Sequence, residues 1–400
     1  MRILLASIYP WIYVLLFLTI PFDNYVRVLP NILMGILVLT FPFIVEKAHF
    51  KKLKKVPTLL FILFCVYIVL NALVAGRLEG DFVLIKKILL AFGLVLLYIP
   101  IQDSEKIKRA ILFSSLAVIL FSVINIFVII NTSEDIVLGF SRQVIEALLI
   151  ERLYLGFIAI LSVLISYQAI QPKFHPNNKY FLANIIVNVL FVFLLVSKIA
   201  VIILGVLFML RQLYGAKRVL RFPIALVLVS AMAFGVFAMM RSEKNQDQQR
   251  SFLESTLTWE LRTEVWKCVS YISESEGLLV SGFGFNETKE KLVACYQERI
   301  ENDYKRGVFV TLRHNTHNQF ADIYFNWGII ALVLFVSFLL ALFFTNQKRF
   351  LSVAYLITLV SYCMVENVFH RQIGAYYVGF VLIATLIQYQ MEENNDKKQA

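Results

Sequence analysis

The chain has 400 residues, of which 59% are hydrophobic and 16% are charged, and its formal net charge is +11. Its mean hydropathy is +0.74. Apolar runs long enough to cross a hydrocarbon core as helices recur along most of its length, so the composition indicates a polytopic membrane protein and excludes a soluble globular one. Lys and Arg lie mainly in short loops between these runs. This pattern reports membrane topology and disfavours nucleic-acid binding.

Twelve membrane-spanning helices are predicted from the apolar runs. In chain order they cover 4–20, 28–45, 58–75, 83–100, 110–130, 153–170, 180–196, 199–213, 224–240, 327–345, 351–365 and 374–390. The first run lacks a small-residue cleavage site, so we expect it to stay in the protein as a signal anchor. The seventh and eighth runs could form one long helix or a hairpin broken at "VSKIA", around Lys198.

The basic loops favour the hairpin. The loop "EKAHFKKLKKVP" (46–57) holds five lysines, and "RQLYGAKRVLRFP" (211–223) holds four cationic residues. Loops rich in Lys and Arg remain in the cytoplasm. Only a hairpin leaves all such loops on one side, together with both chain termini, so we expect both termini to be cytoplasmic.

A long polar segment separates the ninth span from the tenth. It contains 11 basic and 13 acidic residues and therefore has no inward bias. The predicted fold is all-α and has four parts. They are spans 1–9 in residues 1–240, an external loop domain in 241–326, spans 10–12 in 327–390, and a cytoplasmic tail in 391–400.

Two amphipathic helices are expected inside the external segment. The first covers 251–275, and a turn follows at "GFGFN". The second covers 287–306, with Gly307 as its C-cap; its apolar residues at i, i+4 spacing are Leu292, Tyr296, Ile300 and Tyr304. Cys268 and Cys295 lie in this segment and could pair in an oxidising compartment.

Several kinds of chemistry have no motif in this sequence. It contains no phosphate-binding glycine loop, no dinucleotide fingerprint and no cysteine or histidine spacing typical of a metal site. We therefore expect no metal and no cofactor. An enzyme of this kind would take a substrate that arrives already activated.

The run "HNTHNQ" (314–319) lies just before the tenth span. Thr316 and Gln319 have the spacing of a capping box, which predicts that a helix starts here with His317 as about its first residue. The positive end of the helix dipole would keep that imidazole neutral, so His317 can act as a general base. The alternative is that both histidines only cap the helix at the membrane interface. Metal binding by His314 and His317 lacks further ligands.

On a helical wheel, His317 and the nearby asparagine residues lie on different faces of the predicted helix. His317 falls on the face of Phe320 and Tyr324. The other polar residues form a separate stripe that contains Asn315, Asn318, Asp322 and Asn326.

One spacing in this region matches a known signature. His317 and Asn318 are followed by nine residues and then by Gly328, while Ala331 occupies the last position of the pattern. In this the chain resembles the O-antigen ligase and polymerase family of bacterial surface-polysaccharide assembly, whose signature ends in Gly, Thr or Tyr. The resemblance extends to the twelve spans, the large outer loop, "LRTEVW" and "ENVFHRQIG". "VSKIA" is similar to a Ser-Arg-Ala-like turn of the family, with Lys198 in place of Arg.

The resemblance implies a GT-C-like fold in the bacterial inner membrane, with the long loop in the periplasm. It implies a metal-independent glycosyltransferase that moves a glycan from undecaprenyl pyrophosphate to a hydroxyl of lipid A core or of another glycan. His317 is then the general base, and Arg262 is its catalytic partner. The expected pyrophosphate-binding residues are Lys198, Arg313, Arg371, Arg152, Lys86 and Lys87. The expected supporting residues are His314, Asn318, Gln319 and Gly328.

Other interpretations remain open at the level of sequence. Arg371 could pair with Glu366, and Arg262 could be a surface charge of its helix. Arg152, which is adjacent to Glu151, could be a side chain that extends to the membrane interface. A polymerase of the same family needs the same donor and the same kind of acceptor. A lipid-linked sugar flippase or transporter would also have many helices, but it has less use for a structured outer segment.

Overall fold

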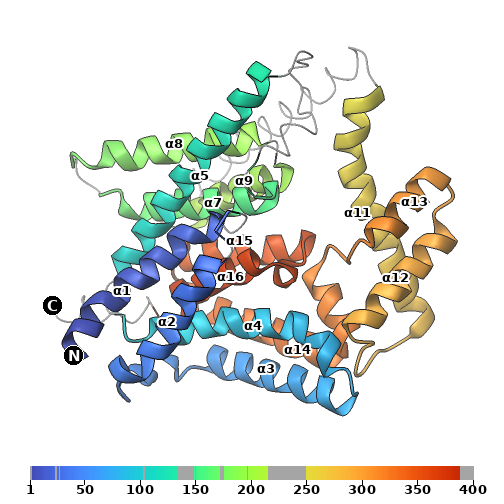
Figure 1. The fold of residues 1–400 in the computed structure, drawn as a ribbon, viewed down its shortest axis with the longest axis horizontal. Helices are drawn as coiled ribbons and strands as arrows, with labels where there is room; N and C mark the ends of the chain where they lie inside the picture. The colour runs from blue at the N-terminus through green and yellow to red at the C-terminus, as the bar shows by residue number, and fades with distance from the viewer. Residues whose placement is uncertain are drawn as a thin grey trace.

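The computed structural model describes residues 2–22, 25–26, 28–101, 104–132, 148, 150–171, 175–195, 197–214 and 249–387. In this part of the chain every regular element is a helix (Figure 1). The first half contains α1 (Arg2–Thr19), η1 (Ile20–Phe22), α2 (Val28–Ile44), η2 (His49–Leu53), α3 (Val56–Val74), α4 (Leu78–Tyr98), α5 (Ser104–Thr132), α7 (Arg152–Ala169), α8 (Asn178–Leu194) and α9 (Lys198–Leu213). The second half contains α11 (Gln249–Glu276), α12 (Phe285–Arg299), α13 (Asp303–Leu312), α14 (Gln319–Asn346), α15 (Phe350–Val365), η4 (Val368–His370) and α16 (Gln372–Leu386).

The bundle has the length and composition of a membrane protein. Among the residues that the structure describes, five helical segments are long and apolar enough to cross a membrane: Arg2–Phe22, Val56–Val74, Glu105–Val128, Arg152–Ala169 and Gln319–Asn346. Four shorter helices, α2, α8, α15 and α16, are also apolar. Each predicted span overlaps a helix except 224–240, which lies outside the described residues. The chain is therefore an all-α membrane protein, as its composition predicts.

The predicted break at "VSKIA" is present. Helix α8 ends at Leu194, and α9 begins at Lys198. Asn178 at the start of α8 bonds to Gln171, just beyond the end of α7. Arg211, near the end of α9, bonds to Tyr167 in the last turn of α7. Helices α8 and α9 consequently run in opposite directions.

Several loops meet at one end of the bundle, which we call the basic end. Lys52 donates to the carbonyl of Ile99 at the end of α4, and Lys55 donates to Leu386 at the end of α16. The lysine-rich loop 46–57 thus covers the ends of two later helices. At the opposite end lie the beginnings of α4, α7, α9, α14 and α16, together with helices α11, α12 and α13, which form the right side of Figure 1.

The second predicted helix of the polar segment is wrong in its extent. Helix α12 ends at Arg299, and α13 begins at Asp303 and runs through the expected C-cap Gly307. The side chain of Asn302 accepts a hydrogen bond from the backbone N–H of Lys305 at 2.9 Å. This N-cap starts a new helix and interrupts the apolar i, i+4 series.

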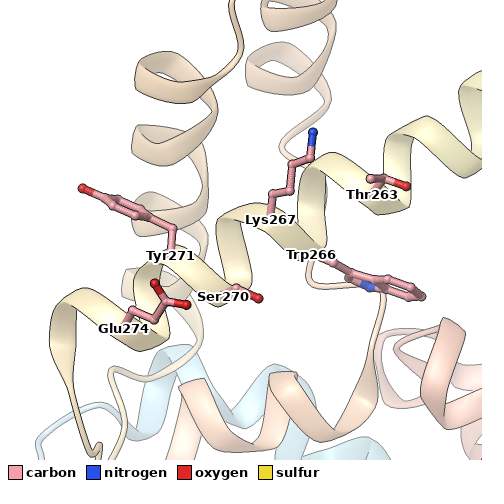
Figure 2. Close-up of a pocket in the computed structure, with 6 residues that line it drawn as sticks. All are labelled: Thr263, Trp266, Lys267, Ser270, Tyr271 and Glu274. Carbon is pink, nitrogen blue, oxygen red and sulfur yellow. The ribbon is translucent and has the colours of Figure 1, made fainter.

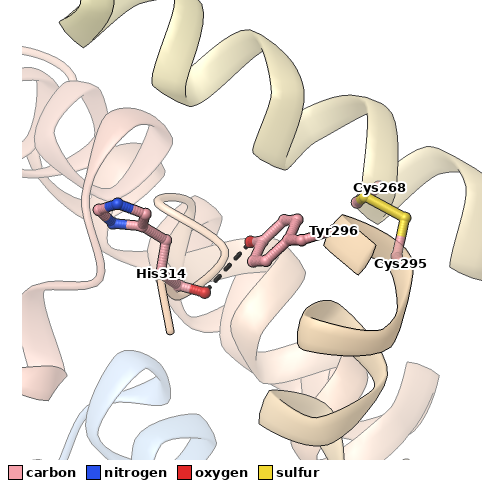
Figure 3. Close-up of a disulfide and its surroundings, with 4 residues drawn as sticks. All are labelled: Cys268, Cys295, Tyr296 and His314. Carbon is pink, nitrogen blue, oxygen red and sulfur yellow. Dashed lines mark hydrogen bonds between the residues drawn. A yellow bond between two sulfur atoms is a disulfide. The ribbon is translucent and has the colours of Figure 1, made fainter. Parts of the chain in front are cut away.

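Helices α11 and α12 are joined by a disulfide between Cys268 and Cys295 (Figure 3). Around it lies a small core that includes Val265, Ile272 and Phe309, all buried. Because Tyr296 follows Cys295 and its hydroxyl donates to the carbonyl of His314 at 3.1 Å, the disulfide-linked helices also hold the loop before α14.

Removing the disulfide is expected to destabilise this domain. A cross-link between cysteines 27 residues apart restricts the unfolded chain and contributes about 3–4 kcal/mol. Thermal unfolding of a Cys268→Ser/Cys295→Ser variant in detergent should therefore begin at lower temperature and be insensitive to reductant. A Cys65→Ala variant, which changes a buried free thiol, should keep the reductant sensitivity. Mass spectrometry that finds both thiols alkylated in protein isolated under alkylating conditions would contradict the disulfide.

Candidate functional site

The candidate site lies at the end of the bundle opposite the basic end. It is formed by the loop between α13 and α14, by the connection between α15 and α16, and by the first residues of α7 and α9. Helix α11 contributes Arg262. These segments are far apart in sequence, so only the fold brings their polar side chains together.

His317 faces the carboxylate of Glu366. The Nδ1 atom of His317 lies 3.4 Å from Oε2 of Glu366, and the two side chains are 21% and 12% exposed. Burial raises the pKa of Glu366, but the hydrogen bond and charge of His317 and the charge of Arg262 outweigh it, so the net pKa is below its usual value. The carboxylate is therefore ionised at neutral pH. It can hold a proton on Nδ1 of His317, which leaves Nε2 as an acceptor.

The predicted capping box is wrong, although a helix does begin in this run. Helix α14 starts at Gln319, and its N-cap is Asn318, whose Oδ1 accepts from the N–H groups of Phe320 and Ala321 at 2.9 and 3.1 Å. The two side chains expected to form the box bind other groups. Thr316 Oγ1 donates to the carbonyl of Asn318 at 3.0 Å.

The Gln319 side chain is held by the connection between α15 and α16. Its Oε1 accepts from the N–H of Phe369 at 3.0 Å. Asn367, which is fully buried, takes the N–H of Asn318 on its Oδ1 at 2.7 Å and donates from Nδ2 to Thr316 at 2.9 Å. Amide side chains thus fasten the loop that carries His317 to the loop that carries Glu366.

His317 is not the first helical residue, so its predicted position on the helical wheel is also wrong. It precedes the N-cap and has φ of 44°, in the left-handed region that residues other than glycine seldom adopt. Its N–H donates to Oδ1 of Asn315 at 3.1 Å. Such strained conformations persist where the surroundings fix them, and they occur often at functional sites.

Three cations from separate helices gather beside this pair. Arg152 begins α7, Lys198 begins α9, and Arg262 lies on α11. The charges of Arg152 and Arg262 act on each other and on Lys198, and Glu366 acts on Arg262. Burial lowers the pKa of Arg262, and its Nε is buried without a hydrogen-bond partner in the described part of the chain. Such a cluster is suited to bind an anion.

The other cations predicted to bind pyrophosphate lie outside the cluster of Arg152, Lys198 and Arg262. Arg371 bonds to Glu151 and not to Glu366. Lys87 donates to the carbonyl of His370, and the charge of Lys86, which is exposed, acts on it. Arg313 bonds to Glu290 on α12, and its charge acts on Lys289. The interactions found for Arg313 therefore join it to the polar domain and not to the Arg262 cluster.

His314 packs beside His317 without sharing its environment. The ring centroids of the two histidines are 5.8 Å apart, and Phe309 covers the other side of His314 at 5.1 Å. Burial, with the charge of His317, lowers the pKa of His314 to about 4. A neutral, enclosed ring shapes the site and is poorly placed to exchange protons. Within the described residues no group of three or more His, Cys, Asp or Glu side chains could hold a metal ion.

Gly328 interrupts α14 with φ of 81° and ψ of −175°. The break frees the carbonyls of Phe325 and Asn326, which accept from the N–H groups of Phe283 and Gly284 at 2.6 and 3.0 Å. Asp81 on α4 completes this joint, because it accepts from the N–H of Phe285 at 2.7 Å and from the indole of Trp327 at 3.1 Å. The polar domain is thereby fixed to the bundle next to the site.

Three residues of the site are not predicted from the sequence as functional residues: Glu366, Asn367 and His370. The sequence offers Glu366 only as a possible partner of Arg371. The signal that could identify all three is a run of polar residues, "ENVFHRQ", between two apolar helices. Buried polar groups at that depth are costly unless they are paired or functional.

A hollow of about 470 Å³ runs along α11 (Figure 2). It is lined by Thr263, Trp266, Lys267, Ser270, Tyr271 and Glu274. Trp266 is four residues beyond Arg262, so the two lie on one side of the helix. Trp266, which lines one end of the hollow, is thus one helical turn from Arg262.

No protein-family model matches this chain, and no curated protein sequence matches it either.

Proposed function

We propose that this protein is a membrane glycosyltransferase that uses a lipid-pyrophosphate-linked glycan as donor. In particular, we propose an O-antigen ligase that transfers the glycan from undecaprenyl pyrophosphate to a hydroxyl of lipid A core on the periplasmic face of the inner membrane. The observation that carries this proposal is the His317–Glu366 pair beside Arg152, Lys198 and Arg262. A base next to an anion site fits the transfer of a sugar from a pyrophosphate to a hydroxyl.

These positions support the following reaction. Nε2 of His317 takes the proton of the acceptor hydroxyl while the oxygen attacks the anomeric carbon of the donor sugar. The bond between that carbon and the pyrophosphate oxygen breaks, and the electron pair leaves with the pyrophosphate. Arg262, Arg152 and Lys198 stabilise the charge that develops there. The proton remains on the imidazole, where Glu366 stabilises the cation.

The location of the site in the bundle supports a reaction on the periplasmic face of the membrane. The lysine-rich loop 46–57 lies at the basic end of the bundle, and the positive-inside rule predicts that this end faces the cytoplasm. The site lies at the opposite end. A substrate with a polyprenyl tail can enter that end from the outer leaflet.

The hollow on α11 offers a surface for the sugars of the donor. Trp266 provides a flat apolar face, and Thr263, Ser270 and Glu274 provide groups that hydrogen-bond to hydroxyls. The guanidinium of Arg299 lies over one face of the Tyr271 ring. Because Trp266 is one helical turn from Arg262, a donor whose pyrophosphate lies at the cations has its first sugars close to this surface.

The direct test of the function is deletion of the gene followed by analysis of surface polysaccharide. Loss of long chains from lipid A core, with accumulation of lipid-linked polymer, is the expected result. Single repeat units on lipid A core would instead identify a polymerase, which the same site could serve. Unchanged surface polysaccharide would contradict both.

Replacement of Arg262 tests the anion site. Arg262→Ala should lower the rate of transfer by about 10²- to 10³-fold, because a buried donor aimed at developing charge is lost. Arg262→Lys should retain part of the rate, since it keeps the charge without the bidentate fork. The measurement is transfer of lipid-linked glycan in membranes with matched protein levels. Arg306→Ala removes an arginine of α13 that bonds to Asp303 and should leave the rate within about twofold. Equal losses in both alanine variants would argue against a role of Arg262 in the site.

A further inference from the structure

A second histidine–carboxylate pair lies behind the loop that carries His317. Nε2 of His370 is 3.0 and 3.1 Å from the two carboxylate oxygens of Asp322. Asp322 is 2% exposed, and it also accepts from Gln319 at 3.4 Å. On the other side of the ring, Nδ1 of His370 is 3.4 Å from Nδ2 of Asn315. This imidazole is therefore enclosed between two side chains and cannot reach a substrate through either nitrogen.

The direction of each hydrogen bond follows from one backbone group. The N–H of His317 can only donate, and it meets Oδ1 of Asn315 at 3.1 Å. The amide nitrogen of Asn315 must then face His370, and since this nitrogen is also a donor, Nδ1 of His370 must accept. The ring proton is consequently on Nε2 and is donated to Asp322.

One neighbour approaches the same nitrogen without changing this assignment. Nδ2 of Asn367 lies 3.3 Å from Nε2 of His370. It donates to Oγ1 of Thr316 at 2.9 Å, and both carboxylate oxygens of Asp322, which accept, lie closer to Nε2 than Asn367 does. Asp322 remains the acceptor for the proton on Nε2.

We propose that Asp322 is a positioning residue that acts through His370 and Asn315 to hold His317 in its left-handed conformation, facing Glu366. The carboxylate fixes the proton on Nε2 of His370, and that tautomer orients the amide of Asn315. The amide oxygen then holds the N–H of His317. The expected effect on glycan transfer rests on the proposed function. The hydrogen bonds from Asp322 to His317 do not depend on that function.

Asp322→Asn is the variant that tests the tautomer. An amide behind a histidine removes the charge that keeps the proton on the facing nitrogen, and the other tautomer then forms. With the proton on Nδ1, His370 and Asn315 would present donors to each other, and the Asn315 amide would turn away from His317. We expect transfer to fall about tenfold, at protein levels and melting temperature close to those of wild type.

Adding Asn315→Asp should restore the rate to within about threefold of wild type. A carboxylate at position 315 accepts both from Nδ1 of His370 and from the N–H of His317. In an Asn315→Ala background, where the connection is already cut, Asp322→Asn should cause little further loss, because coupled residues are not additive. Asp303→Asn, which makes the same change at an exposed position, is the matched control.

A chemical readout separates this inference from the proposed function. The rate at which diethyl pyrocarbonate modifies His317 can be followed by peptide mass spectrometry in each variant, with no glycan substrate. It should rise at least about threefold in Asp322→Asn and return toward wild type in the double variant. Modification that is unchanged in Asp322→Asn, or additive losses without restoration, would overturn the positioning role. If modification follows the expected order and wild-type protein transfers no glycan, the proposed function fails and the positioning role stands.

Discussion

Replacement of His317 with alanine is expected to lower the rate of glycan transfer by about 10²- to 10⁴-fold, the range that a positioned general base contributes. The reason is local. Glu366 faces Nδ1, so Nε2 is the only ring nitrogen left to take the acceptor proton, and alanine provides no substitute. Transfer should be measured in membranes with matched amounts of protein, with the rate followed at saturating donor.

Two companion variants separate the base from its surroundings. Glu366→Gln should also lose a large part of the rate, because the amide no longer stabilises the imidazolium or fixes its proton. His314→Ala is the matched control for loss of an adjacent imidazole, and it should cost less than about tenfold because His314 only packs against the site. Full activity in His317→Ala would rule out the general base.

The pH dependence of the transfer rate can be separated from two groups of the site, His314 and Glu366. The pKa of His314 is lowered to about 4, so folding favours its neutral form. The stability linked to His314 falls as the pH drops from its ordinary pKa toward 4, and the ring stays neutral between pH 5 and 8. Glu366 has a lowered pKa and is ionised across the same range. If the rate of glycan transfer falls as the pH is lowered from 8 to 5, the fall therefore cannot come from protonation of His314 or Glu366.

The sequence could predict the elements whose causes are local. Apolar length predicts the membrane helices, and the distribution of the basic loops favours the hairpin with its break near Lys198. The sequence alone could not show which residue of "HNTHNQ" is the N-cap. Thr316 and Asn318 are both good caps by type, and the choice depends on Asn367, which is 49 residues beyond Asn318 and binds its N–H.

The same limit explains the other differences. The apolar series through Leu292, Tyr296 and Ile300 continues to Tyr304 in sequence, but Asn302 starts a new helix and leaves Tyr304 81% exposed. The partner of His317 could not be found by spacing either. Glu366 follows it by 49 residues and reaches it only because two loops are joined by amide hydrogen bonds.

Among the residues that match the signature, Gly328 is the one for which the structure clearly requires the residue type. Its φ of 81° with ψ of −175° belongs to a region that is essentially restricted to glycine. A Cβ at this position would also overlap the carbonyl of Val280 and lie 2.8 Å from the N–H nitrogen of Ser281. Both atoms are backbone and belong to the segment that pairs with the break in α14, so they cannot move aside without disturbing the joint.

Gly328→Ala is therefore expected to destabilise the protein by at least about 3 kcal/mol, combining backbone strain with a clash against backbone. It should lower both the accumulation of protein in membranes and the melting temperature in detergent. Gly307→Ala is the matched control, because Gly307 is helical and a Cβ there meets nothing within 4 Å. That change should stabilise α13 by about 0.5–1 kcal/mol. If Gly328→Ala melted like wild type, the close approach of residues 280–281 to α14 would be wrong. The site depends on that approach, since the same joint holds the start of α14, and with it the loop of His317, against the bundle.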